Sequence, residues 1–115
     1  MRRFALALAA LLAAAAPAVA ADGARLFALQ CKACHSTVST PMGPTLLGVA
    51  GGPVAGRADF KYSAALKAKG GTWTADRLDA YLAAPLTFAP KGRMTAAVVD
   101  AKNRAAIVAY VEGLK

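Results

Sequence analysis

Apolar side chains recur at helical spacing in the second half of this chain. Leu78, Tyr81 and Leu82 stand at i, i+3 and i+4 within residues 75–84, so a helix would place them on one face. A second apolar stripe near the C-terminus consists of Ile107, Tyr110, Val111 and Leu114. The spacing predicts a helix over residues 75–84 and a last helix that begins after Asp100.

The residues at the expected helix ends agree with these boundaries. Thr74 and Asp100 have side chains that can accept a hydrogen bond from the first turn of a helix, which makes each a suitable N-cap. Pro85 should close the helix over residues 75–84, because proline cannot extend a helix.

The first half of the chain is less regular. Residues 22–33 mix apolar and polar positions as an amphipathic helix does, and a short helix is expected over residues 63–69. Residues 36–71 hold most of the glycine and proline, which favours turns over long elements. No stretch alternates with period two for long enough to predict a strand. The sequence predicts one small all-α domain of about four short helices joined by long loops.

Residues 1–20 follow the pattern of a secretory signal peptide. Two arginines precede an apolar run over residues 4–16, and residues 18–20 read Ala-Val-Ala, a small-residue cleavage pattern. We expect cleavage after Ala20, which leaves residues 21–115 as the mature domain. The alternative is a retained membrane anchor, but a spanning helix needs about 20 strongly apolar residues, and this stretch is mostly alanine with one proline.

Length and charge narrow the function classes once this segment is set aside. The chain has 115 residues and a formal net charge of +8, and removal of the first twenty residues with their two arginines leaves 95 residues and a charge of +6. That length excludes a multidomain enzyme, and two cysteines exclude a disulfide-dense scaffold. A chain this short buries little core of its own, so we expect another component to supply part of it.

Cys31, Cys34 and His35 form the motif C-x-x-C-H at the end of the first expected helix. This motif is the attachment signature of a c-type haem. Two thiols three residues apart lie on one helical turn, so both can reach the vinyl groups on one edge of a porphyrin. The next residue can then direct an imidazole nitrogen to the iron. The expected cofactor is one haem c, attached covalently through Cys31 and Cys34. The apolar porphyrin of this haem would also provide the part of the core that the short chain lacks.

Three other uses of the motif fit less well. A thioredoxin-like redox dithiol requires a βαβ context, which the pattern does not predict. A zinc site requires four ligands, and the two cysteines with the single histidine leave one missing. A plain structural disulfide leaves the adjacent His35 without a role.

The iron needs a second axial ligand beside His35, and methionine is the one that raises the reduction potential of electron carriers. Beyond the signal segment the candidates are Met42 and Met94. Met42 follows His35 by seven residues, so its loop would have to cross from one haem face to the other. Met94 ends the loop over residues 90–94, which has room to fold over the opposite face. We favour Met94, with Met42 as the alternative, and either side chain can instead fill apolar space.

With these motifs, residues 22–115 resemble the soluble class I cytochromes c. Gly23 and Phe27 precede the first cysteine by eight and four residues, as a helix-contact glycine and a core aromatic do in that family. Residues 43–48, Gly-Pro-Thr-Leu-Leu-Gly, resemble the family's GP-x-L-x-G segment. The resemblance implies the class I cytochrome c fold, and a carbonyl of Pro44 that orients the axial histidine.

The resemblance also implies contacts to the haem periphery. Tyr62 and Trp73 correspond to residues that bind a buried propionate, which is the role we favour; the alternative is that both are core aromatics. Tyr81 corresponds to a tyrosine whose hydroxyl lies near the methionine sulfur.

Three departures from the family concern the haem edge. Gly52 stands where many members carry a propionate-binding arginine. Either Arg57 compensates from a few residues on, or the propionate is more exposed. The loop before Met94 lacks the usual threonine, and Ala96 replaces a phenylalanine, which would open the haem edge to solvent. The short loop over residues 36–42 indicates a compact bacterial subtype.

The function that the resemblance implies is one-electron transfer in the periplasm, not enzymatic catalysis. Exposed basic side chains would steer the domain to redox proteins with acidic docking faces; the candidates are Lys32, Lys61, Lys67, Lys69, Lys91 and Arg93. No motif indicates nucleic-acid binding, and no stable membrane insertion is expected after signal cleavage. Two alternatives stay open: a haem enzyme or gas sensor with a labile sixth ligand, and a cytochrome subunit dedicated to one exported dehydrogenase.

Overall fold

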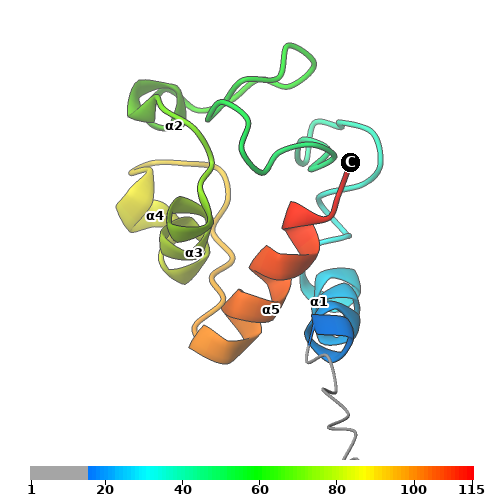
Figure 1. Cartoon of the computed structure of the whole chain (residues 1–115). Helices are drawn as coiled ribbons and strands as arrows, with labels where there is room; N and C mark the ends of the chain where they lie inside the picture. The colour runs from blue at the N-terminus through cyan, green and yellow to red at the C-terminus, as the bar shows by residue number, and fades with distance from the viewer. Residues whose placement is uncertain (1–15) are drawn as a thin grey trace, which may run out of the picture.

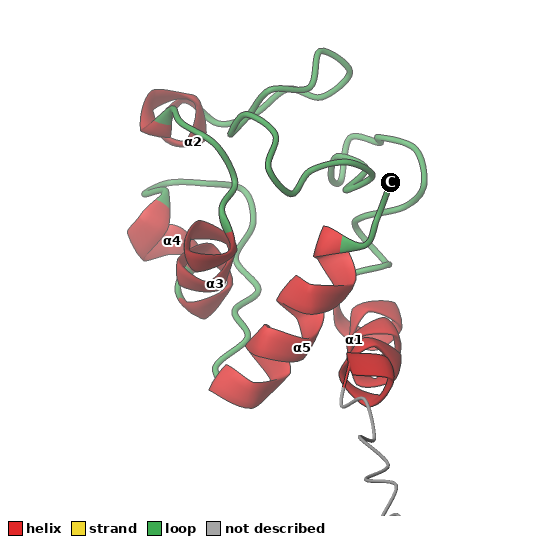
Figure 2. Ribbon diagram, in the orientation of Figure 1, coloured by secondary structure: helices red, strands yellow, loops and turns green. Residues whose placement is uncertain are grey.

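The computed structural model describes residues 16–115, with side chains from residue 22 onward. Most of the predicted signal segment lies outside the described residues. The elements are α1 (Ala16–Gln30), α2 (Ala64–Lys69), α3 (Ala75–Ala83), α4 (Pro85–Phe88) and α5 (Ala101–Glu112), joined by long loops (Figures 1 and 2). Within residues 16–115 the only β-type pairing is two isolated bridges, Thr40 with Gly43 and Pro53 with Thr72. The predicted all-α fold is confirmed.

The N-caps are those that the sequence indicates. The Thr74 hydroxyl accepts a hydrogen bond from the Arg77 amide at 3.2 Å, and the Asp100 carboxylate accepts one from the Asn103 amide at 2.9 Å. Ser63 caps α2 in the same way, through the Leu66 amide.

Several boundaries differ from the prediction. The first helix begins at Ala16 rather than at residue 22, inside the predicted signal segment. The first helix ends at Gln30 rather than at residue 33, because the Lys32 amide bonds to the Phe27 carbonyl and widens the chain into a turn. Pro85 ends α3 as expected, but it also begins α4, where a proline fits the first helical position. The prediction of about four helices therefore missed one helix, the four-residue α4.

The crossing of α1 and α5 forms one side of the core. At the contact, a Cβ on Gly23 would lie 2.2 Å from the Ala106 carbonyl oxygen, so only glycine allows the helices to approach this closely. Phe27 and Tyr110 pack nearby with ring centroids 5.1 Å apart. Figure 1 places α3 and α4 on the other side of α5 from α1.

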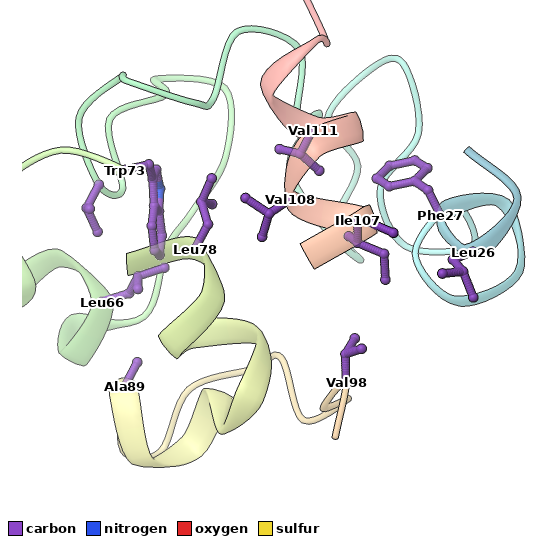
Figure 3. Packing of buried hydrophobic residues seen from close by; sticks show 12 residues of the cluster. Leu26, Phe27, Leu66, Trp73, Leu78, Ala89, Val98, Ile107, Val108 and Val111 are labelled. Carbon is purple, nitrogen blue, oxygen red and sulfur yellow. The ribbon is translucent and has the colours of Figure 1, made fainter. Parts of the chain in front are cut away.

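The core side chains face one another across the middle of the domain. Figure 3 shows Leu66, Trp73 and Leu78 on one side and Ile107 and Val108 of α5 on the other. Loops complete this wall: the amides of Gly51 and Val54 bond to the carbonyls of Trp73 and Gly71. Among the described helices, none combines the length and apolar character needed to cross a bilayer.

Candidate functional site

A mostly apolar cavity of about 500 Å³ occupies the middle of the domain. It lies between the core side chains of Figure 3 and the loops that follow α1 and α4. Eight of the nine residues predicted for the cofactor site line it: Cys31, Cys34, His35, Pro44, Tyr62, Trp73, Tyr81 and Met94. Residues that are up to 63 positions apart in sequence therefore meet around one space.

The two cysteines lie on a tight turn that continues from α1. The Cys31 amide bonds to the Phe27 carbonyl at 2.8 Å, and the His35 amide bonds to the Cys31 carbonyl at 2.9 Å. Both thiols are free, Cys31 half-buried and Cys34 exposed. Burial raises the pKa of the Cys31 thiol, with a further rise from the neighbouring Cys34. The turn offers two thiols on one rim of the cavity, as covalent attachment to one porphyrin edge requires.

His35 is oriented by a backbone carbonyl. Its Nδ1 lies 2.8 Å from the Pro44 oxygen, and because a carbonyl can only accept, Nδ1 carries the proton. The lone pair of Nε2 is then available for a metal. Gly43 makes the approach possible, since a Cβ there would lie 2.6 Å from the Cys34 oxygen and 3.2 Å from His35 Nδ1. The Pro44 interaction implied by the resemblance is present.

The two candidate methionines differ in exposure. Both border the cavity, but the Met42 side chain is 69% exposed, whereas Met94 is half-buried. The loop of Met94 runs between two buried residues, Ala89 and Val98, whose amides bond to the carbonyls of Pro85 and Leu82. Burial therefore favours Met94 over Met42 as the residue directed to the cavity.

The aromatic residues form two clusters around the cavity. Trp73 packs against Tyr81 and Phe88 with centroids 5.2 and 5.6 Å apart, and Phe60 meets the edge of Tyr62 at 5.0 Å. Burial raises the pKa of both tyrosine phenols. Phe88 was not foreseen as part of this cluster, because Pro85 interrupts the periodicity that would relate it to α3.

Arg57 lies apart from the cavity. Its guanidinium donates two hydrogen bonds, of 2.9 and 2.8 Å, to the Asp59 carboxylate, and the side chains of both residues are solvent-exposed. It does not line the cavity. Arg93, which the sequence suggested only as a docking cation, does line it, and its side chain is bound to two backbone carbonyls.

The residues present fit a covalently attached haem. The cavity is mostly apolar and is bordered by the thiols of Cys31 and Cys34. It is also bordered by the His35 imidazole, whose tautomer is fixed by Pro44, and by the half-buried thioether of Met94. Each of these groups has a place in c-type haem attachment and ligation.

Comparison with known proteins agrees with this geometry. The family model described as "Cytochrome c" matches residues 20–115. The cytochrome c-type cyt cy of Rhodobacter capsulatus is 39% identical over 94 residues, which cover 80% of this chain and 47% of that protein. Cytochrome c 2.1 of Caenorhabditis briggsae is 38% identical over 93 residues, covering 78% of this chain and 83% of that protein.

The solved structure of cytochrome cH from Methylobacterium extorquens superposes with a TM-score of 0.74 at 39% identity, covering 81% of this chain and 96% of that one. The chain spans about half the length of the first curated relatives it matches. The family match extends over the cavity and the C-x-x-C-H turn. The chain therefore belongs to the cytochrome c family, a family of electron-transfer proteins rather than enzymes, with one haem c attached through Cys31 and Cys34.

Proposed function

We propose that this chain is an exported one-electron carrier whose haem iron is coordinated by His35 and Met94. The observation that carries the proposal is that the C-x-x-C-H turn, a histidine fixed by Pro44 and a half-buried methionine all border one cavity. When bound, the haem supplies an iron that alternates between the ferric and ferrous states.

The ligands determine what the site does. The Pro44 carbonyl holds the His35 ring in one orientation and increases the basicity of its second nitrogen. Met94 would supply the second protein ligand of the iron, and the iron would then have no free site for a substrate. The mostly apolar wall would lower the polarity around the iron, and a methionine ligand raises the reduction potential.

The aromatic residues are proposed to act on the haem periphery. Tyr62 and Trp73 would contact a propionate, and Tyr81 would lie near the Met94 sulfur, which is consistent with their places in the cavity wall. The predicted role of Arg57 has no support of this kind, because its guanidinium is bound to Asp59 at the surface.

The charge distribution supports transient protein partners. The basic residues predicted for docking are all exposed, and they would increase the rate of association with acidic redox proteins in a salt-dependent manner. We further propose that residues 1–20 direct export and are removed, so that the mature domain acts in the periplasm. Mass spectrometry of protein recovered from the periplasm tests both export and cleavage, because the mass shows whether residues 1–20 have been removed.

The ligand assignment is tested by absorption spectroscopy of Met94→Ala and Met42→Ala. Met94→Ala should abolish the near-infrared methionine–iron band of the oxidised protein and lower its potential, whereas Met42→Ala, the matched control, should keep both. The reverse result would transfer the ligand role to Met42.

Carbon monoxide distinguishes a carrier from a haem enzyme or gas sensor. A carrier with Met94 on the iron should bind little carbon monoxide in the reduced state at neutral pH. Ready binding by the wild type would favour the gas sensor or enzyme. Co-purification with a single exported dehydrogenase would instead identify a dedicated subunit.

A further inference from the structure

Arg93 joins three loops at the wall of the cavity. Its Nη1 donates to the Lys61 carbonyl at 2.7 Å, and its Nη2 donates to the Pro41 carbonyl at 2.6 Å. These acceptors lie 32 and 52 residues before Arg93 in the sequence. One side chain therefore connects the loop that follows the C-x-x-C-H turn, the loop before α2 and the loop of Met94.

The planar face of the same guanidinium is also packed. It lies 5.1 Å from the centroid of Phe60, whose ring in turn meets Tyr62 edge-on. Phe60, Tyr62 and Arg93 all border the cavity. A planar fork can reach two carbonyls and stack on a ring at once, which the single ammonium group of a lysine cannot do.

The loop of Met94 has little backbone support of its own. In the described part of the chain, the loop amides of residues 93–97 make no backbone–backbone hydrogen bond, although those of Gly92 and Val98 on either side do. The contacts of Arg93 are thus the ties nearest to Met94. A side chain that served only to attract partners would not need both ends of its guanidinium bound to internal carbonyls.

We propose that Arg93 is a positioning residue that holds the loop over residues 90–97 against the cavity and thereby keeps Met94 in place. The inference rests on the proposed role of Met94 as a ligand. Without the two bonds to Lys61 and Pro41, the loop opens more often, and an added ligand can replace the thioether.

The test uses the haem-loaded protein with Arg93→Gln, Arg93→Lys and the control Arg57→Gln. The control removes another exposed arginine, which is bound to Asp59 and does not border the cavity. There are two readouts. The first is imidazole binding to the oxidised protein, monitored through the loss of the near-infrared band. The second is hydrogen exchange of the amides of residues 91–97.

For Arg93→Gln we expect roughly tenfold tighter apparent imidazole binding, because each lost charge-assisted bond raises the population of the open loop. The amides of the loop should exchange faster in this variant. Arg93→Lys should fall between Arg93→Gln and wild type, and Arg57→Gln should match wild type.

Two results would overturn the inference: equal imidazole binding in Arg93→Gln and Arg57→Gln, or full restoration by Arg93→Lys, which would mean that charge alone matters. Failure of the proposed function gives a different result, because a wild-type protein without the near-infrared band would show that Met94 is not a ligand at all.

Discussion

The two proposed ligands are held by different kinds of structure. His35 follows α1, which is packed against α5 through the Gly23–Ala106 contact, and its ring is bound to Pro44 nine residues away. Met94 lies in a loop whose nearest ties are side-chain bonds from Arg93 to distant carbonyls. Packed helices open only with much of the core, whereas a loop tied by a few bonds can open locally. The methionine side should therefore be the more easily displaced.

The largest effect is expected on the histidine side, from Gly23→Ala. The added Cβ would lie 2.2 Å from the Ala106 oxygen, and neither backbone can move without separating α1 from α5. We expect the free energy of unfolding to fall by about 3 kcal/mol, more than the roughly 1 kcal/mol that alanine gains over glycine in a helix. Denaturant unfolding measures the change.

Ala28→Leu is the matched control for Gly23→Ala. Ala28 is an exposed residue of the same helix, so its substitution should alter stability by less than about 0.5 kcal/mol. A stabilised Gly23→Ala protein would contradict the close approach of α1 and α5.

An intermediate effect is expected for Arg104→Gln, at the far end of the Met94 loop. Arg104 bonds to Asp79 at 2.9 Å and to the carbonyls of Val98 and Val99 at 3.0 and 2.8 Å. Loss of these bonds should cost about 2 kcal/mol of stability and weaken the methionine–iron band on heating. Lys102→Gln changes the same charge at an exposed site of α5 and should leave both unchanged.

The smallest effect is expected from the exposed pair Arg57–Asp59, which does not border the cavity. Hydrogen bonding to Arg57 holds the pKa of Asp59 below its ordinary value of 3.8. A lowered carboxylate pKa stabilises the fold above the unfolded pKa, and the contribution is lost as pH falls through the folded value. The stability difference between wild type and Asp59→Asn should therefore be small at neutral pH and shrink below about pH 4. A difference that grows with acidity would contradict this pairing.

Local signals in the sequence predicted much of this molecule. Periodicity located α3 and α5, and the side chains of Thr74 and Asp100 identified their first turns because an N-cap acts within three residues. The C-x-x-C-H motif predicted the cofactor for the same reason, since its chemistry requires a single turn. In contrast, α4 was missed, because four residues carry no periodicity and Phe88 joins the helix through its packing on Trp73.

Arg57 and Arg93 show which properties of the site could be predicted from neighbouring residues and which depend on the tertiary structure. Both read as exposed cations in the sequence, and the resemblance directed attention to Arg57. The fold pairs Arg57 with Asp59, two residues along, and brings Arg93 to carbonyls 32 and 52 residues away. No local pattern contains such long-range partners.

The sequence by itself determined the positions of α2, α3 and α5, the N-caps Thr74 and Asp100, and the attachment chemistry, because each depends on residues within one or two turns of one another. Only the tertiary structure decided which methionine is half-buried, which aromatic residues gather around the cavity and which arginine ties its loops together. Those outcomes depend on loop closure and packing between distant segments, where the physical partner of a side chain is chosen by the fold and not by its neighbours in the chain.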